Sequence, residues 1–70
     1  MSNYISIGGS SIVAEGDLTT TYRGGKRHIA TTSHSITING ERVALAPGEE
    51  REVGGYRLRG TARGIKGEQL

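Results

Sequence analysis

The chain has 70 residues, enough for one domain, with nine Lys and Arg against seven Asp and Glu and a net charge of +2. It contains no cysteine, which excludes disulfides, and no apolar run is long enough to cross a bilayer as a helix. Residues 1–4 lack the charged start and apolar stretch of a secretory signal. We therefore expect a soluble, cytoplasmic protein with no membrane partner.

Four pairs of residues that favour positive φ divide the chain at intervals of 16, 15 and 15 residues. They are Gly8-Gly9, Gly24-Gly25, Asn39-Gly40 and Gly54-Gly55. Such pairs form the two-residue turns of β-hairpins, because both central positions need left-handed backbone angles. A second set of breaks lies between them. The pattern predicts a repeated hairpin of about fifteen residues, with all the glycine turns at one end of a sheet.

The strands that this pattern predicts, in chain order, are residues 3–7, 10–14, 18–23, 26–31, 34–38, 41–45, 50–53 and 56–59. Around Asn39-Gly40, Ile36 would face Val43, which places apolar side chains on one side of the hairpin. Around Gly24-Gly25, Arg23 would face Lys26, and like charges opposite each other destabilise a strand pair. We expect no helix of useful length.

These elements predict an all-β fold: a small antiparallel meander of short strands, closed as a barrel or packed as two sheets, over residues 1–60. Residues 61–70 carry glycines and basic residues, and we expect them to form a flexible C-terminal tail. The inward-facing side chains should be those of Ile5, Ile7, Ile12, Leu18, Ile29, Ile36, Ile38, Val43, Leu45, Val53 and Leu58.

The apolar inventory is small, with fourteen Ile, Leu and Val residues, three Tyr, and no Phe or Trp. Below about 70–80 residues, a core alone rarely supplies more than a few kcal/mol of stability. We therefore expect the chain to form a homo-oligomer, or else to be weakly stable on its own.

A row of arginines is the first candidate binding feature. Arg27, Arg42 and Arg57 each follow a glycine pair by two residues, and Arg59 and Arg63 add positive charge near the end of the chain. On one polar sheet face these side chains would form a basic stripe for an anionic partner. The alternative is an ordinary solvated face, on which charged side chains serve solubility.

The segment TYRGGKRH is the second candidate, with Tyr22, Arg23, Lys26 and Arg27 around two glycines. Backbone N–H groups of a glycine turn, surrounded by cations, can hold a phosphate or carboxylate. Tyr22 or Tyr56 could stack on a base or on an arginine. The alternative is a solvated hairpin end.

Metal and catalytic sites have little support. His28 and His34 are six residues apart, and no cysteine or third ligand accompanies them. No nucleophile elbow, HExxH motif or paired-carboxylate spacing occurs. We expect a non-enzymatic protein without a metal or cofactor.

The segments EGDLTTTYRGG and SITINGERVA resemble PAAR-repeat spike-tip proteins, which use GD, GG and NG turns in a similar order. The zinc ligands of that family are missing here beyond the two histidines. We interpret the resemblance as shared turn chemistry and not as membership.

The leading interpretation is a small β interaction module, of the kind that phages encode to engage or inhibit a host macromolecule; its location would then be the host cytoplasm. The alternatives are a nucleic-acid or nucleotide binder and a structural subunit of an oligomeric or virion assembly. The predicted partner is an anionic protein or nucleic acid. The residues expected to contact it are Tyr22, Arg23, Lys26, Arg27, Arg42, Tyr56, Arg57, Arg59 and Arg63.

Overall fold

The computed structural model describes residues 3–7 and 9–70, and within them the chain forms nine strands and no helix. The strands are β1 (Asn3–Ile7), β2 (Ser10–Ala14), β3 (Leu18–Arg23), β4 (Lys26–Thr31), β5 (Ser35–Ile38), β6 (Glu41–Ala44), β7 (Glu50–Val53), β8 (Tyr56–Gly60) and β9 (Ile65–Gln69). The predicted all-β class is confirmed. The first eight strands match the predicted ranges to within one residue at each end.

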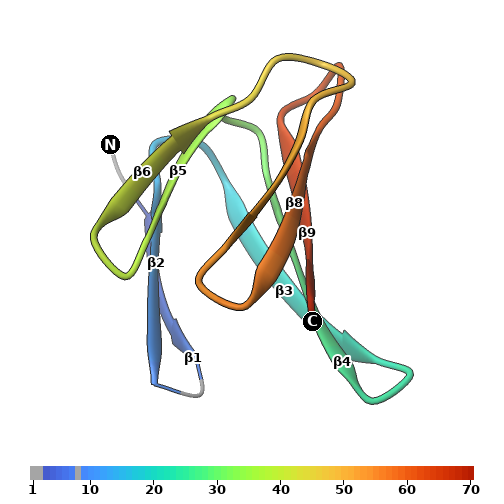
Figure 1. The fold of residues 1–70 in the computed structure, drawn as a ribbon. Helices are drawn as coiled ribbons and strands as arrows, with labels where there is room; N and C mark the ends of the chain where they lie inside the picture. Colours follow the sequence, from blue (N-terminus) through green and yellow to red (C-terminus); the bar gives the residue numbers. More distant parts are fainter. Residues whose placement is uncertain (1–2, 8) are drawn as a thin grey trace.

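Two antiparallel sheets pack against each other, so the two-sheet alternative is the correct one and the sheets are not closed as a barrel. The first sheet has the order β1-β2-β5-β6, and the second has the order β3-β4-β9-β8-β7. Successive hairpins alternate between the sheets, as Figure 1 shows. The pairing departs from a simple meander at two places, where β5 pairs with β2 and β9 pairs with β4.

The hairpin turns have the backbone that their residues favour. Asn39 and Gly40 have φ of 51° and 84°, the signs that a type I′ turn requires at both central positions. In Figure 1 the loops after β3, β5 and β7 lie toward the lower side of the view, and the connections between hairpins lie toward the upper side. Gly8, the first residue of the first predicted turn, lies outside the described residues.

The C-terminal segment differs from the prediction. Residues 65–69 are not a flexible tail but form β9, which pairs with β4 on one side and with β8 on the other. Ile65 is 1% exposed, and a Cβ placed on Gly67 would lie 2.7 Å from Cγ1 of Ile29. Gly67 therefore lies where side chains of the neighbouring strands approach β9 closely. Close approach of another group is one reason for a glycine inside a strand.

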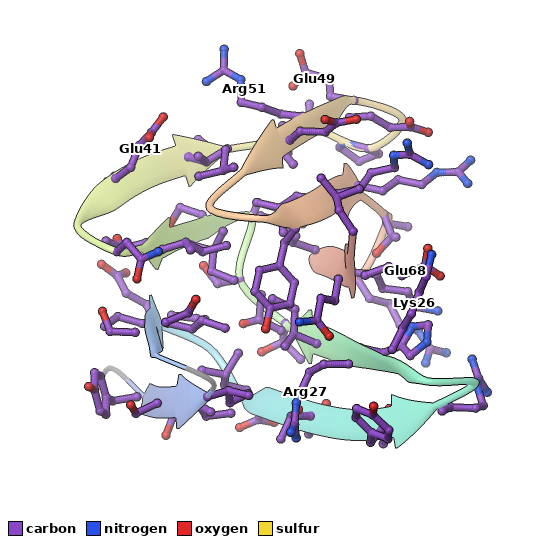
Figure 2. The ribbon with its side chains drawn as sticks, turned by 60° about the horizontal axis from the view of Figure 1, so that its bottom comes forward. Lys26, Arg27, Glu41, Glu49, Arg51 and Glu68 are labelled. Carbon is purple, nitrogen blue, oxygen red and sulfur yellow. The ribbon has the colours of Figure 1, made fainter. Side chains whose placement is uncertain are left out.

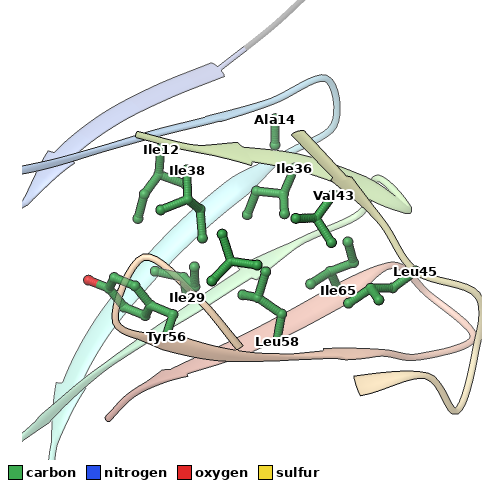
Figure 3. Close-up of a cluster of buried hydrophobic side chains, with 11 residues drawn as sticks. Ile12, Ala14, Ile29, Ile36, Ile38, Val43, Leu45, Tyr56, Leu58 and Ile65 are labelled. Carbon is green, nitrogen blue, oxygen red and sulfur yellow. The ribbon is translucent and has the colours of Figure 1, made fainter. Parts of the chain in front are cut away.

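The core lies between the sheets and is made of aliphatic side chains from both (Figure 3). The buried residues of the cluster are Ile12, Ala14, Ile29, Ile36, Ile38, Val43, Leu45, Val53, Tyr56, Leu58 and Ile65. Of the predicted inward residues, Ile7 and Leu18 are partly buried against this cluster, and Ile5 is half-buried. Ala14, Tyr56 and Ile65 complete the core, although none of the three belongs to the predicted set.

Candidate binding surfaces

The predicted arginine stripe does not form, because Arg42 lies in the other sheet and because Arg27 and Arg57, which share the five-stranded sheet, face opposite sides of it. Arg42 precedes the buried Val43 on β6 and so faces outward from the four-stranded sheet. Arg57 lies between the buried Tyr56 and Leu58, and faces outward from the five-stranded sheet. Arg27 shares the inward side of β4 with Ile29. Three arginines with one sequence spacing thus lie on three different surfaces.

The outer face of the five-stranded sheet does gather charge. Following the strand register from β3 to β7, one row across this face reads Thr19, Ala30, Lys66, Arg59 and Glu50. The next row reads Thr21, His28, Glu68, Arg57 and Glu52. We call this surface, together with Arg23 and Lys26 at the end of β3 and β4, the basic face.

Ion pairs neutralise part of the basic face. Arg57 lies 3.4 Å from Glu52 and Arg59 lies 3.8 Å from Glu50, with all four side chains more than half exposed. Glu68 lies 3.8 Å from Lys26, and the two side chains point toward each other in Figure 2. Exposed pairs of this kind are each worth about 0–1 kcal/mol, so an incoming partner can exchange them at little cost.

The centre of the basic face carries a like-charge opposition that the Arg59–Glu50 pair offsets only in part. Lys66 lies directly opposite Arg59 in the β8–β9 register, and like charges in that relation destabilise a sheet. Among the described residues, no ion pair includes Lys66 or Arg23. Two shallow hollows of about 200 and 280 Å³ flank Lys66, because Thr19 and Ala30 have small side chains. Arg63 lines the larger hollow.

The tip of the second hairpin is divided between two surfaces. Arg23 and Lys26 are direct register partners, as predicted, and Glu68 offsets the charge of Lys26. Tyr22 and Arg27 form the preceding pair, and their side chains lie on the inward side of the sheet. Cations therefore do not surround the glycines Gly24-Gly25 on one side, as a phosphate cradle requires.

A cleft opens between the two sheets at the end where the glycine turns lie. Its volume is about 380 Å³, and Tyr22, Arg27 and Tyr56 line it together with Ile7 and Gln69. The guanidinium of Arg27 lies 5.4 Å from the centre of the Tyr22 ring. We call this site the inter-sheet cleft. It brings together three of the residues that the sequence marks as candidates.

Tyr56 does not have the place that the sequence predicts for a stacking residue. Its side chain is 3% exposed and packs in the core, so no base or arginine of a partner can lie on its ring. In Figure 3 the hydroxyl oxygen points away from the apolar cluster. The reason is the register of the last hairpin, in which Tyr56 is opposite the buried Val53.

The two histidines lie apart and have different partners. His34 Nε2 is 2.9 Å from the carbonyl oxygen of Thr61, and His28 Nδ1 is 3.9 Å from Glu68. Within residues 3–7 and 9–70, no three His, Asp or Glu side chains lie close enough together to hold a metal ion. No helix in this part of the chain is long and apolar enough to cross a membrane.

Sequence reasoning gave Lys66 and Glu68 too little weight, because it assigned them to a tail. The signal that could have found them is the alternation of Ile65, Gly67 and Gln69 with two charged residues, which has the period of a strand. The fold and its surfaces define a small two-sheet antiparallel β-domain with a charged outer face and a cleft between the sheets. Comparison with protein-family models, curated proteins and solved structures finds no match for the chain.

Proposed function

We propose that the chain is a non-enzymatic interaction module that binds an acidic surface of a partner protein through the basic face. The observation that carries this proposal is the direct opposition of Lys66 and Arg59. Their repulsion weakens the free protein, and carboxylates of a partner relieve it in the complex. The small side chains of Thr19 and Ala30 leave room beside Lys66 for those carboxylates.

The basic face has no aromatic side chain among the described residues, and this favours a protein partner over a single-stranded nucleic acid. Within the described residues, Tyr22 and Tyr56 line the inter-sheet cleft, and Tyr4 belongs to β1 in the other sheet. Binding of single strands relies on bases stacking on aromatic rings, and the basic face offers none. Its glutamates also alternate with its cations, which suits the mixed charge of a protein surface better than a run of phosphates.

Non-enzymatic binding is supported by the surroundings of the histidines. A nucleophilic mechanism needs a hydroxyl or thiol within hydrogen-bond reach of a base. In the described part of the chain, neither histidine ring is hydrogen-bonded to a hydroxyl, and His34 instead contacts a backbone carbonyl. The basic face is also an open sheet surface, which does not exclude water from a reaction.

The test compares the parent with the double variant Lys66→Gln and Arg59→Gln in pull-downs from lysate, with and without nuclease. Arg42→Gln is the matched control, because it removes the same charge from the outer face of the other sheet. We expect one defined protein to be retained by the parent and the control, to be lost at least tenfold by the double variant, and to be insensitive to nuclease.

Two results would contradict this proposal. Retention of the same protein by the double variant would mean that the basic face is only a solvated surface. Capture that nuclease abolishes, with an affinity falling steeply as salt rises, would identify a nucleic acid as the partner.

A further inference from the structure

Arg27 is a half-buried cation for which the described residues supply no counter-charge. None of the ion pairs or side-chain hydrogen bonds among residues 3–7 and 9–70 includes its guanidinium. Arg57 and Arg59, by contrast, are mostly exposed and each has a glutamate within 4 Å. The guanidinium therefore lines the cleft without a counter-charge among these residues and is available to pair with an anion.

The guanidinium is also held in a defined orientation. Its carbon lies 5.4 Å from the centre of the Tyr22 ring, and the hydroxyl of Tyr22 donates a hydrogen bond of 3.2 Å to the Gly25 carbonyl. The ring is thereby anchored to the turn, and the guanidinium lies over it at a cation–π distance. No side-chain hydrogen bond among the described residues uses the guanidinium N–H groups, which leaves them for a carboxylate or phosphate.

Further donors surround the same space. The side-chain oxygen of Gln69 accepts the backbone N–H of Arg27 at 3.2 Å, so its NH₂ group remains available as a donor. Tyr56 lines the cleft, and the hydroxyl of this otherwise buried side chain points away from the apolar cluster in Figure 3. Three donor groups of different types thus line one cleft.

Apolar side chains form part of the cleft lining beside the polar groups. Ile7 contributes an apolar wall from the four-stranded sheet, and the tyrosines come from the five-stranded sheet. The volume of about 380 Å³ falls in the range of about 300–1,000 Å³ that small-molecule sites occupy. Gly54 and Gly55, both with positive φ, border the cleft without side chains that would fill it.

From these contacts we infer that the inter-sheet cleft binds a small molecule in which an oxyanion is attached to a flat apolar body. The anion pairs with the free edge of the Arg27 guanidinium, and the Tyr56 hydroxyl and the Gln69 amide donate to it. The flat body lies between Ile7 and the exposed ring of Tyr22. This site is separate from the basic face, so it does not rest on the proposed function.

The test is a titration of the full chain, followed through its ¹H–¹⁵N amide spectrum, with benzoate, phenyl phosphate, inorganic phosphate and benzyl alcohol at constant ionic strength. Benzoate and phenyl phosphate distinguish a carboxylate from a phosphate ligand. Inorganic phosphate lacks the flat body, and benzyl alcohol lacks the charge. For probes of this size, ligand efficiency gives an expected Kd of about 1 mM.

We expect saturable shifts at the amides of Arg27, Gly55 and Gln69 with at least one aromatic anion, and much weaker binding of inorganic phosphate and benzyl alcohol. Arg27→Gln should raise Kd at least tenfold. Tyr56→Phe should raise it several-fold, while the phenyl ring retains its packing in the core. Arg42→Gln is the charge-matched control and should leave Kd unchanged.

The inference is overturned if neither aromatic anion gives saturable shifts at the cleft, or if benzyl alcohol binds as well as the anions. It is equally overturned if Arg27→Gln binds with the parent's Kd. Because Arg27→Gln removes the stacking on Tyr22, its fold is checked from the same spectrum. If that variant is unfolded, Arg27→Lys replaces it: the charge remains, the paired N–H edge is lost, and a Kd equal to the parent's contradicts the proposal.

Discussion

Replacing Gly67 with alanine tests the packing of β9 at the centre of the five-stranded sheet. Gly67 has no positive φ, so an added methyl group meets no backbone strain. Alanine also lowers the entropy of the unfolded chain, a gain of about 0.4–1 kcal/mol that the packing loss must outweigh. The new Cβ would lie 2.7 Å from Cγ1 of Ile29 and 2.8 Å from Cδ2 of Leu58. Carbon atoms in contact prefer about 3.5–4.0 Å, so both neighbours must move by about 1 Å.

Both neighbours lie in the packed core, so their side-chain ends can shift only by displacing other core atoms. Ile29 is 3% exposed and Leu58 is 0% exposed, and both belong to the core cluster. Overpacking of this kind lowers the free energy of unfolding by about 1–3 kcal/mol. A 70-residue domain has a total of about 4–10 kcal/mol. The loss is therefore a large fraction of the stability, and it should lower Tm by about 4–8 °C for each kcal/mol.

Urea unfolding, followed by far-UV circular dichroism, measures this change. Lys66→Ala is the control, because it alters the adjacent residue on the outer side of the same strand and should change the free energy of unfolding by less than about 0.5 kcal/mol. Leu58→Ala removes one of the crowded atoms and by itself should cost about 2–5 kcal/mol. In the double variant the new methyl group enters the space left by Leu58, so the combined loss should be about 1 kcal/mol or more below the sum.

Two outcomes would refute this reasoning. If Gly67→Ala unfolds at the same urea concentration as the parent, β9 does not lie against Ile29 and Leu58. If the losses of the two single variants simply add in the double variant, Gly67 and Leu58 are not in contact, and the loss in Gly67→Ala has another origin.

Three further predictions follow from the fold. Gly40→Val should destabilise the chain by more than about 1 kcal/mol in thermal unfolding, because φ of Gly40 is 84° and a β-branched residue resists that conformation; an unchanged Tm would contradict the turn assignment. Deleting residues 61–70 should abolish the dispersed amide spectrum, because the deletion uncovers the backbone of β4 and β8 and removes the buried Ile65. A folded deletion variant would show that β9 is dispensable. Sedimentation at micromolar concentration should detect a dimer or larger species, or else a chain melting below the range of about 45–65 °C that is typical of mesophile domains; a monomer melting well above that range would contradict the expectation of a marginal core.

Local chemistry allowed the hairpins to be predicted from the sequence. The preference of Asn39-Gly40 for positive φ depends on those two residues alone, and the alternation of Ile36 and Ile38 with polar neighbours depends on the two-residue period of a strand. Neither depends on what the hairpin packs against. The predicted strands and most of the predicted core are for this reason confirmed, including the opposition of Ile36 and Val43.

The tertiary structure decided which hairpins lie side by side, and with that the position of every candidate side chain. A hairpin exposes unpaired strand edges on both sides, and the sequence does not state which other edge will cover them. β9 pairs with both β4 and β8. The sequence pattern places Gly67 in a flexible tail, whereas in the fold Gly67 leaves the space that Ile29 and Leu58 occupy.

For the candidate sites, too, the sequence predicted the residue types, and the tertiary structure decided which of them lie together. Sequence spacing aligned Arg27, Arg42 and Arg57, but a spacing of fifteen residues carries no information about which sheet each hairpin joins. The alternation of hairpins between sheets separated Arg42 from the other two, and the inward side of β4 placed Arg27 in the inter-sheet cleft with Tyr22 and Tyr56. Residues distant in sequence come together through non-local strand pairing, which is set by the burial of apolar faces and strand edges across the whole chain and not by any local residue pattern.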